Sequence, residues 1–190
     1  VLVDPFYGQP SIAVAKEKHI PLILSREESG YTDNPDGRLT TLSQYTSKDL
    51  KEMGASAIKI LLYFNSKAQN VNEQIEIVKQ VAAECQEVSL PFLIEPITYE
   101  IPGVEYNKAH ETLNTLSMIS QYADILKIEY PTDVKTEPLE KALPYLQEIS
   151  HMLEGKPWIL LSRGNIDFET FVKALEVCKQ ADGSGYAVGR

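Results

Sequence analysis

Seven short runs of aliphatic and aromatic residues recur along the chain of 190 residues, and helix-like segments with charged faces separate most of them. The runs begin 21, 35, 35, 33, 33 and 27 residues apart. Near-continuous apolar strands that alternate with helices are typical of a parallel sheet whose faces are covered by the helices. The expected strands are residues 1–4, 22–25, 57–64, 92–99, 125–130, 158–162 and 185–189.

The segments between the later runs have the apolar spacing of amphipathic helices. In 72–88, Ile75, Val78, Val81, Ala82 and Cys85 form one stripe, because they follow the i, i+3, i+4 pattern. The other expected helices are 107–122, 137–153 and 167–181, the last with Asp167 as its N-cap.

A period near 34 residues also occurs in helical solenoids, but those repeats lack a β-branched strand in each unit. A doubly wound open sheet is disfavoured because no GxGxxG motif follows any of the strands. Seven evenly spaced strand–helix units predict an α/β fold, a (β/α)8 TIM barrel with one strand missing. The chain starts without Met, directly in an apolar run. We therefore expect residues 1–190 to be a single partial barrel domain, a fragment with strands two to eight but without the first strand and the last helix.

Charge and composition exclude several classes of partner. Acidic residues outnumber basic ones 27 to 18, giving a net charge of −9, which disfavours nucleic acid as the main partner. No apolar run approaches the ~20 residues of a membrane span, and we expect no signal peptide. The two cysteines form no CxxC pattern and the three histidines no metal cluster. These features predict a cytoplasmic protein with no membrane partner and no metal.

Ionisable residues interrupt the predicted strands. Lys59, Glu95 and Lys127 each lie inside an apolar run, Glu27 follows another, and Glu129 shares a strand face with Lys127. Outward positions of a barrel are covered by apolar helices, so we expect these charges to point inward at the active mouth. The polar stretch 30–42 follows the second strand, so it is expected to form a loop over the same face.

Two explanations compete for these charges. Lysine–glutamate pairs could simply neutralise one another, although buried pairs add little net stability. Alternatively, a desolvated lysine near a second lysine loses its proton more easily and attacks a carbonyl to form a Schiff base, while a glutamate moves protons. That chemistry is typical of class I aldolases and needs no metal and no cofactor. Residue type alone leaves the choice between Lys59 and Lys127 open. A glycosidase with paired carboxylates leaves both lysines unexplained, and Ser162 has no His–Asp partner pattern for a serine hydrolase.

The loops after the last two strands have features of a phosphate site. One reads Ser162-Arg163-Gly164-Asn165, and the other is Gly189-Arg190. In many barrels these two loops bind phosphate through backbone N–H groups. Glycine lets the backbone approach a ligand closely, and arginine can bind phosphate with two parallel hydrogen bonds.

Seven motifs in order resemble the class I tagatose 1,6-bisphosphate aldolase family, which includes relatives acting on sulfofructose 1-phosphate. The motifs are LVDPFYG, ILSREESGY, AIKILLYF, FLIEPITYE, DILKIEYP, WILLSRG and GYAVGR. The resemblance implies that Lys127 is the Schiff-base lysine, Lys59 the second active-site lysine, Glu95 the acid/base and Glu27 a further active-site carboxylate. It places phosphate binding on Leu161, Ser162, Gly164, Gly189 and Arg190.

The resemblance also implies a small phosphosugar substrate, cleaved to dihydroxyacetone phosphate and glyceraldehyde 3-phosphate. Sulfofructose 1-phosphate is the alternative substrate, and a phosphosugar-binding regulatory barrel without turnover is the alternative function. A homo-oligomer is compatible with it. Two departures stand out: the family's first strand, with its own active-site residues, is absent, and Arg163 occupies a position where a small residue is expected.

Overall fold

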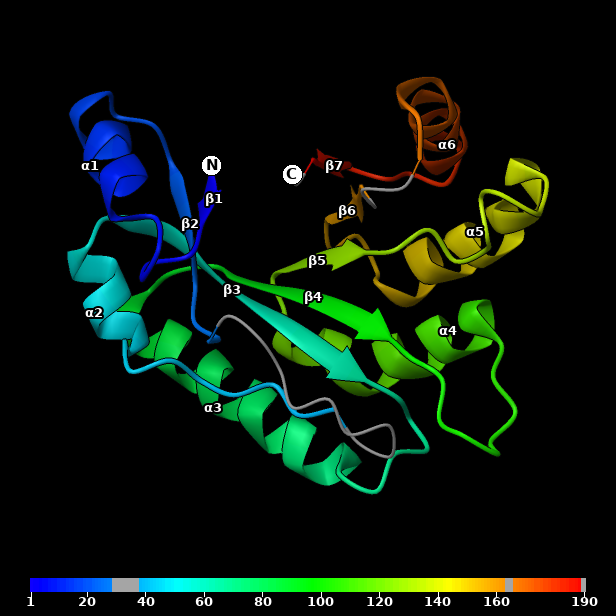
Figure 1. Cartoon of the computed structure of the whole chain (residues 1–190), viewed down its shortest axis with the longest axis horizontal. Helices are drawn as coiled ribbons and strands as arrows, with labels where there is room; N and C mark the ends of the chain where they lie inside the picture. The colour runs from blue at the N-terminus through cyan, green and yellow to red at the C-terminus, as the bar shows by residue number, and fades with distance from the viewer. Residues whose placement is uncertain (29–37, 163–165, 189–190) are drawn as a thin grey trace.

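In the computed structural model, residues 1–28, 38–162 and 166–188 are described. Seven strands form one sheet in the order β1-β2-β3-β4-β5-β6-β7, and every neighbouring pair is parallel (Figure 1). This order follows the chain without a reversal, whereas a doubly wound sheet reverses its strand order. The strands are β1 Leu2–Val3, β2 Leu22–Ser25, β3 Ala55–Phe64, β4 Phe92–Thr98, β5 Ile125–Ile128, β6 Trp158–Leu161 and β7 Gly185–Ala187.

The helices lie along the outer side of the curled sheet (Figure 1). They are α1 Gln9–Glu17, α2 Ser47–Glu52, α3 Val71–Val88, α4 Lys108–Ile119, α5 Leu143–Met152 and α6 Phe168–Gln180, with the 3-10 helices η1 Ser120–Tyr122 and η2 Leu139–Ala142. All four expected helices are present, and the Asp167 side chain accepts a hydrogen bond from the Thr170 N–H as the predicted cap.

Two of the expected helices differ at one end. The final turn of 107–122 is the 3-10 helix η1, and the expected helix 137–153 begins as η2 before α5 starts. Pro144 lies in the first turn of α5, where the missing N–H of proline has no helical partner to lose. The α-helix therefore starts at Leu143 rather than at 137. Two shorter helices, α1 and α2, lie outside the expected ranges.

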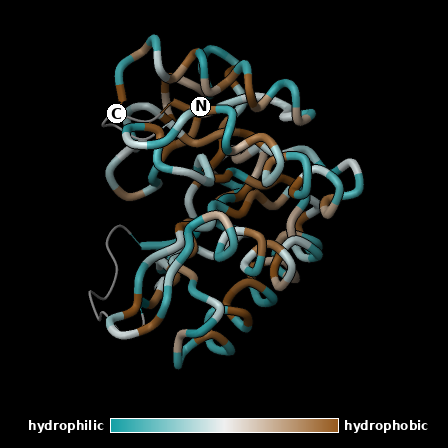
Figure 2. The backbone as a smooth tube through the Cα atoms, turned by 90° about the vertical axis from the view of Figure 1, so that its right-hand side faces the viewer, coloured by the Kyte–Doolittle hydropathy of each residue, from teal (hydrophilic) through white to brown (hydrophobic). Residues whose placement is uncertain are grey.

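The strands alternate between an apolar outer face and a polar inner face. On β3, Ile58, Ile60, Leu62 and Phe64 are buried in the main hydrophobic core against the helices, while Lys59 faces the other way. The helices contribute apolar stripes such as that of α3, and Figure 2 shows hydrophobic and hydrophilic residues alternating along the outer helices. The outer face of the sheet is therefore apolar and packed against the helices, whereas the inner face bears charged side chains.

The sheet is curled but open in the part of the chain that the structure describes. Strands β1 and β7 are its two edges and are not paired with each other there. Apolar side chains are exposed at both edges, including Leu2 beside β2 and Tyr186 beside β6. The predicted seven-stranded partial barrel is confirmed.

Candidate active site

Four charged side chains form a continuous chain on the inner face, three from adjacent strands and one from the segment that follows β2. Lys59 Nζ of β3 lies 2.5 Å from Glu27 Oε1 and 3.2 Å from Glu95 Oε2 of β4. Lys127 Nζ of β5 lies 3.0 Å from the other oxygen of Glu95, Oε1. The four predicted catalytic residues are therefore brought together in the order Glu27, Lys59, Glu95, Lys127.

Strand register explains why these residues meet. Lys59 pairs with Leu93, and Leu61 pairs with Glu95, so Glu95 stands one inward position above Lys59. Lys127 pairs with Ile159 on its other side and follows Leu126, which pairs with Ile94. A parallel register between three sequential strands thus places one carboxylate between two ammonium groups.

All four side chains are almost completely shielded from water. Their exposed fractions are 6% for Lys59, 6% for Glu95, 8% for Lys127 and 11% for Glu27. Burial alone would lower the pKa of Lys59, but the carboxylates of Glu27 and Glu95 outweigh it, and the pKa of Lys59 is raised. Burial therefore acts on Lys59 in the expected direction, but its two carboxylate neighbours decide the net shift. The raised pKa favours the ammonium form of Lys59.

Glu27 lies on an irregular segment rather than in a strand. It follows β2 by two residues and forms an antiparallel bridge with Leu42. Burial raises the pKa of its carboxyl, and the nearby ammonium of Lys59 acts against this effect. Its Oε2 atom is buried without a hydrogen-bond partner among the described residues. Glu27 therefore contacts Lys59 through one carboxylate oxygen, Oε1.

The remaining charge of the predicted set, Glu129, directly follows β5 and is buried. Its Oε1 atom lies 4.0 Å from Lys108 Nζ at the start of α4. Glu129 therefore lies toward the first turn of α4, beside the Lys127 strand.

Two of the five predicted phosphate-binding residues are described, Leu161 and Ser162. Leu161 ends β6, and the Ser162 N–H donates to the Ala187 carbonyl at 3.0 Å, which ties the end of β6 to β7. Gly164, Gly189 and Arg190 lie outside the described residues, as does Arg163. Phosphate binding at this end of the sheet stays a prediction.

A cavity of about 670 Å³ opens beyond the carboxyl ends of β4, β5 and β6. Its lining includes Leu161, Lys108, Lys135 and Arg38, but not the four-residue chain itself. The guanidinium of Arg38 lies over the rings of Tyr63 and Tyr99, 5.5 and 5.4 Å from their centres. Sequence reasoning missed Arg38, because a single arginine at the end of a polar loop has no pattern of its own.

Two other features bear on the chemistry. Within the described ranges, no group of three or more His, Cys, Asp or Glu side chains could hold a metal ion. Cys85 and Cys178 are buried free thiols, and burial raises the pKa of each to about 12, so neither is a reactive thiolate.

Of the helices in the described part, none is long and apolar enough to cross a membrane.

The fold and the site define a partial parallel β/α barrel with two lysines and two glutamates in contact on its inner face. The sequence model of the DeoC/LacD family of aldolases matches residues 1–190. The chain belongs to this family.

Curated proteins of similar sequence also carry aldolase names. The chain is 34% identical over 214 aligned positions to a tagatose 1,6-diphosphate aldolase of Staphylococcus aureus, covering 100% of the chain and 65% of that protein. It is 31% identical to tagatose 1,6-diphosphate aldolase 2 of Enterococcus faecalis, covering 100% of the chain and 64% of that protein. The chain thus spans slightly less than two thirds of the length of these curated relatives.

Solved structures resemble the chain in fold. An archaeal fructose-1,6-bisphosphate aldolase, with its catalytic lysine covalently bound to the carbinolamine intermediate, matches with a TM-score of 0.75 at 16% identity, over 100% of this chain and 69% of that one. A fructose-bisphosphate aldolase from Slackia heliotrinireducens matches with a TM-score of 0.74 at 11% identity, over 96% and 58%. At these identities the likeness concerns the barrel fold alone.

Proposed function

We propose that this chain carries the lysine site of a class I aldolase that cleaves a ketose phosphate through a Schiff base. The observation that carries the proposal is the position of the Glu95 carboxylate, which contacts Lys127 with one oxygen and Lys59 with the other. The Glu95 carboxylate, which can exchange protons, thus lies between the Lys127 amine, whose carboxylate contact among the described residues is Glu95, and Lys59, whose pKa is raised. Family membership and the names of the relatives support the same reaction class.

In this mechanism Lys127 is the nucleophile. Its neutral amine adds to the C2 carbonyl of the ketose, and loss of water from the carbinolamine leaves an iminium cation. Lys59 is the less suitable candidate, because its two carboxylate neighbours raise its pKa. The iminium carbon then serves as the acceptor for the electrons of the C3–C4 bond.

Glu95 is the acid/base. It takes the proton of the C4 hydroxyl, directly or through a water molecule, as the C3–C4 bond breaks and the aldehyde leaves. The electron pair forms an enamine on Lys127, which is protonated at C3 and hydrolysed to release dihydroxyacetone phosphate and the free lysine. Lys59 holds Glu95 in place through its 3.2 Å contact, and Glu27 neutralises Lys59 from the other side.

For the substrate we propose tagatose 1,6-bisphosphate, by analogy with the relatives that carry this name. Its C1 phosphate would lie at the β6 end of the site, against Leu161 and Ser162 and the predicted residues Gly164, Gly189 and Arg190. Sulfofructose 1-phosphate is the second candidate, since Arg38 in the adjoining cavity offers a cation to either anionic C6 group. The two buried free thiols fit a reducing compartment, and we place the reaction in the cytoplasm.

The test is reductive trapping in the intact protein. Borohydride added with dihydroxyacetone phosphate should leave a stable adduct on the peptide that contains Lys127, identified by mass spectrometry. Lys127→Met should abolish the adduct, whereas Lys59→Met should still form it. Trapping at an unchanged rate in Lys127→Met would move the nucleophile to Lys59 and refute the assignment.

Turnover separates the remaining alternatives. Initial rates on tagatose 1,6-bisphosphate and sulfofructose 1-phosphate decide which ketose the site prefers. A trapped imine without release of aldehyde from either sugar would instead favour a phosphosugar-binding regulatory protein.

A further inference from the structure

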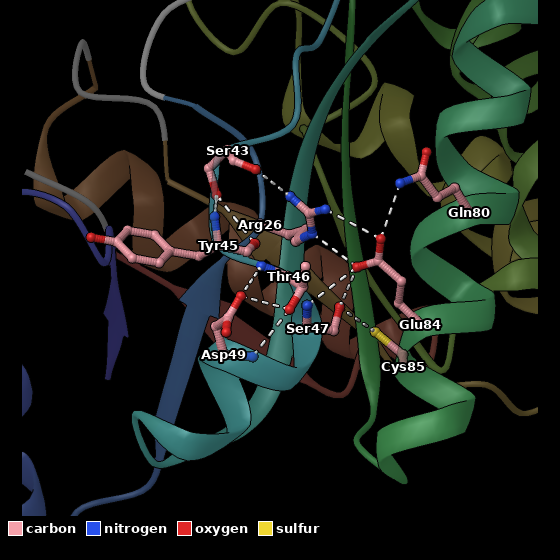
Figure 3. A network of polar contacts seen from close by, with 9 residues as sticks. All are labelled: Arg26, Ser43, Tyr45, Thr46, Ser47, Asp49, Gln80, Glu84 and Cys85. Atoms are coloured by element: carbon pink, nitrogen blue, oxygen red, sulfur yellow. Dashed lines mark hydrogen bonds and ion pairs between the residues drawn. The ribbon is translucent and has the colours of Figure 1, made fainter.

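A second charge network lies on the other side of the segment that carries Glu27; it pairs a buried Arg26 with a half-buried Glu84, whose side chain is 21% exposed. Arg26 is 5% exposed, although it directly follows an apolar strand. Its Nε donates to Glu84 Oε2 of α3 at 2.9 Å, and its Nη2 donates to Glu84 Oε1 at 3.2 Å (Figure 3). The remaining guanidinium nitrogen, Nη1, donates to the Ser43 carbonyl at 2.7 Å. One side chain therefore joins β2 to helix α3 and to segment 41–43.

Glu84, like Arg26, makes several hydrogen bonds. Its carboxylate also accepts hydrogen bonds from the hydroxyl and the N–H of Ser47 and from the Gln80 amide, at 2.9, 3.2 and 3.0 Å (Figure 3). These donors, together with Arg26, overcome the effect of burial and lower the pKa of Glu84 to about 2. The carboxylate stays charged at any physiological pH, so the pair is permanent.

The backbone of this segment is fixed to the active site at the same point. The Arg26 N–H donates to the Lys59 carbonyl at 2.8 Å, and the Arg26 carbonyl accepts from the Ser43 N–H at 2.9 Å. Glu28 N–H donates to the Thr41 carbonyl at 2.9 Å. Because side chains alternate in extended backbone, Arg26 points out toward α3 while Glu27 points in toward Lys59.

We propose that the Arg26–Glu84 pair is a positioning device for catalysis, which holds Glu27 against Lys59 and thereby keeps Lys59 aligned on Glu95. An apolar side chain would fill the space between the sheet and α3 at lower cost, because a buried ion pair contributes little net stability. The directional hydrogen bonds of the pair instead fix the position and rotation of the irregular segment that carries Glu27. This inference rests on the proposed aldolase function.

The test compares two charge removals on one helix of the intact protein. Glu84→Gln loses the charge of the pair, while Glu76→Gln removes a charge from the exposed Glu76–Lys79 pair of the same helix. Glu84→Gln should lower kcat for ketose cleavage about tenfold, with KM changed less than about twofold, because displacement of a catalytic neighbour acts on the chemical step. Glu76→Gln should leave both constants unchanged.

A purely structural role predicts a different outcome. Should Glu84→Gln fold poorly, the double variant Arg26→Met with Glu84→Met replaces the pair by apolar side chains and should restore thermal stability. Its kcat should stay about tenfold below that of the wild type. Full recovery of kcat in this double variant, or kinetics of Glu84→Gln equal to those of Glu76→Gln, would overturn the positioning role.

The proposed function fails separately. A wild-type protein that forms no imine with dihydroxyacetone phosphate and cleaves no ketose phosphate would refute the aldolase, and with it the catalytic meaning of the pair. Wild-type imine formation together with unaffected Glu84→Gln kinetics would refute the positioning role alone.

Discussion

Replacing Lys59 by methionine tests how the buried charges are balanced. The substitution keeps the length of the side chain but removes an ammonium group that lies 2.5 Å from Glu27 and 3.2 Å from Glu95. Removing one partner of a buried pair destabilises a protein by about 3–5 kcal/mol, since it leaves an uncompensated buried charge. For a domain of this size each kcal/mol corresponds to about 2–4 °C, so we expect Tm to fall by about 10 °C near neutral pH.

The loss of thermal stability caused by Lys59→Met should depend on pH. Without Lys59, burial raises the pKa of Glu27 further above its ordinary value, and the folded state then binds a proton more tightly than the unfolded state. Such a group costs stability as the pH rises above the ordinary carboxyl pKa. The difference in Tm between wild type and Lys59→Met should therefore be larger at about pH 8 than at about pH 5.

Differential scanning calorimetry at several pH values measures both effects. The matched control is Lys173→Met, which breaks the Lys173–Glu169 pair on the surface of α6, where the lysine side chain is 59% exposed. Surface pairs contribute little, so this control should leave Tm nearly unchanged. Equal Tm values for the two variants would refute the proposed charge balance among Glu27, Lys59 and Glu95. A loss of Tm in Lys59→Met that is the same across the pH range would refute it as well.

Three further predictions concern other parts of the molecule. Ser162→Ala should raise KM for the phosphorylated ketose about tenfold with a smaller change in kcat, measured by steady-state kinetics; an unchanged KM would remove Ser162 from the phosphate site. Asp167→Ala removes the side chain that caps α6 at the Thr170 N–H, and thermal unfolding should show a Tm lower by a few degrees. Excess chelator should leave aldolase activity intact, because a lysine-based electron sink needs no metal; activity lost to chelator and restored by a divalent cation would contradict the Schiff-base mechanism.

The order of the strands and helices could be predicted from the sequence because each strand is a separate apolar run. All seven expected strands are present, and β2 has the expected ends. The helix ends were harder to predict, since an amphipathic stripe continues through 3-10 turns such as η2. At 138 and 144 the prolines decide where the α-helix can begin, and stripe spacing does not register their missing N–H groups.

The site was predictable only in part. Alternation in the strands placed Lys59, Glu95 and Lys127 on one face, and the register confirmed that they meet. The same pattern left the two lysines equivalent, because nothing in it says that Glu27 reaches Lys59. That contact depends on an irregular segment bridged to Leu42, and together with the Glu95 contact it raises the pKa of Lys59.

Arg26 shows what a stricter use of alternation would have found. In the run Ser25-Arg26-Glu27-Glu28, an inward Glu27 requires an outward Arg26, and an outward position beside β2 is covered by helices. An arginine there needs a buried acceptor. Its partner, Glu84, lies 58 residues away in α3, and only the packing of α3 on the sheet identifies it.

The charges of the four-residue chain also explain why Glu27 is useful to the proposed reaction. If each lysine counts as a cation and each glutamate as an anion, the four charges sum to zero, and an iminium on Lys127 preserves that sum because it is also a cation. When Glu95 accepts the C4 proton, the electrons of the C3–C4 bond convert the iminium into a neutral enamine, so Lys127 no longer needs a counter-charge, but Glu95 also stops neutralising Lys59. Glu27, 2.5 Å from Lys59 Nζ, keeps that ammonium paired through the step. The site can thus move one proton without leaving an unpaired buried charge, which in so dry an environment would cost several kcal/mol.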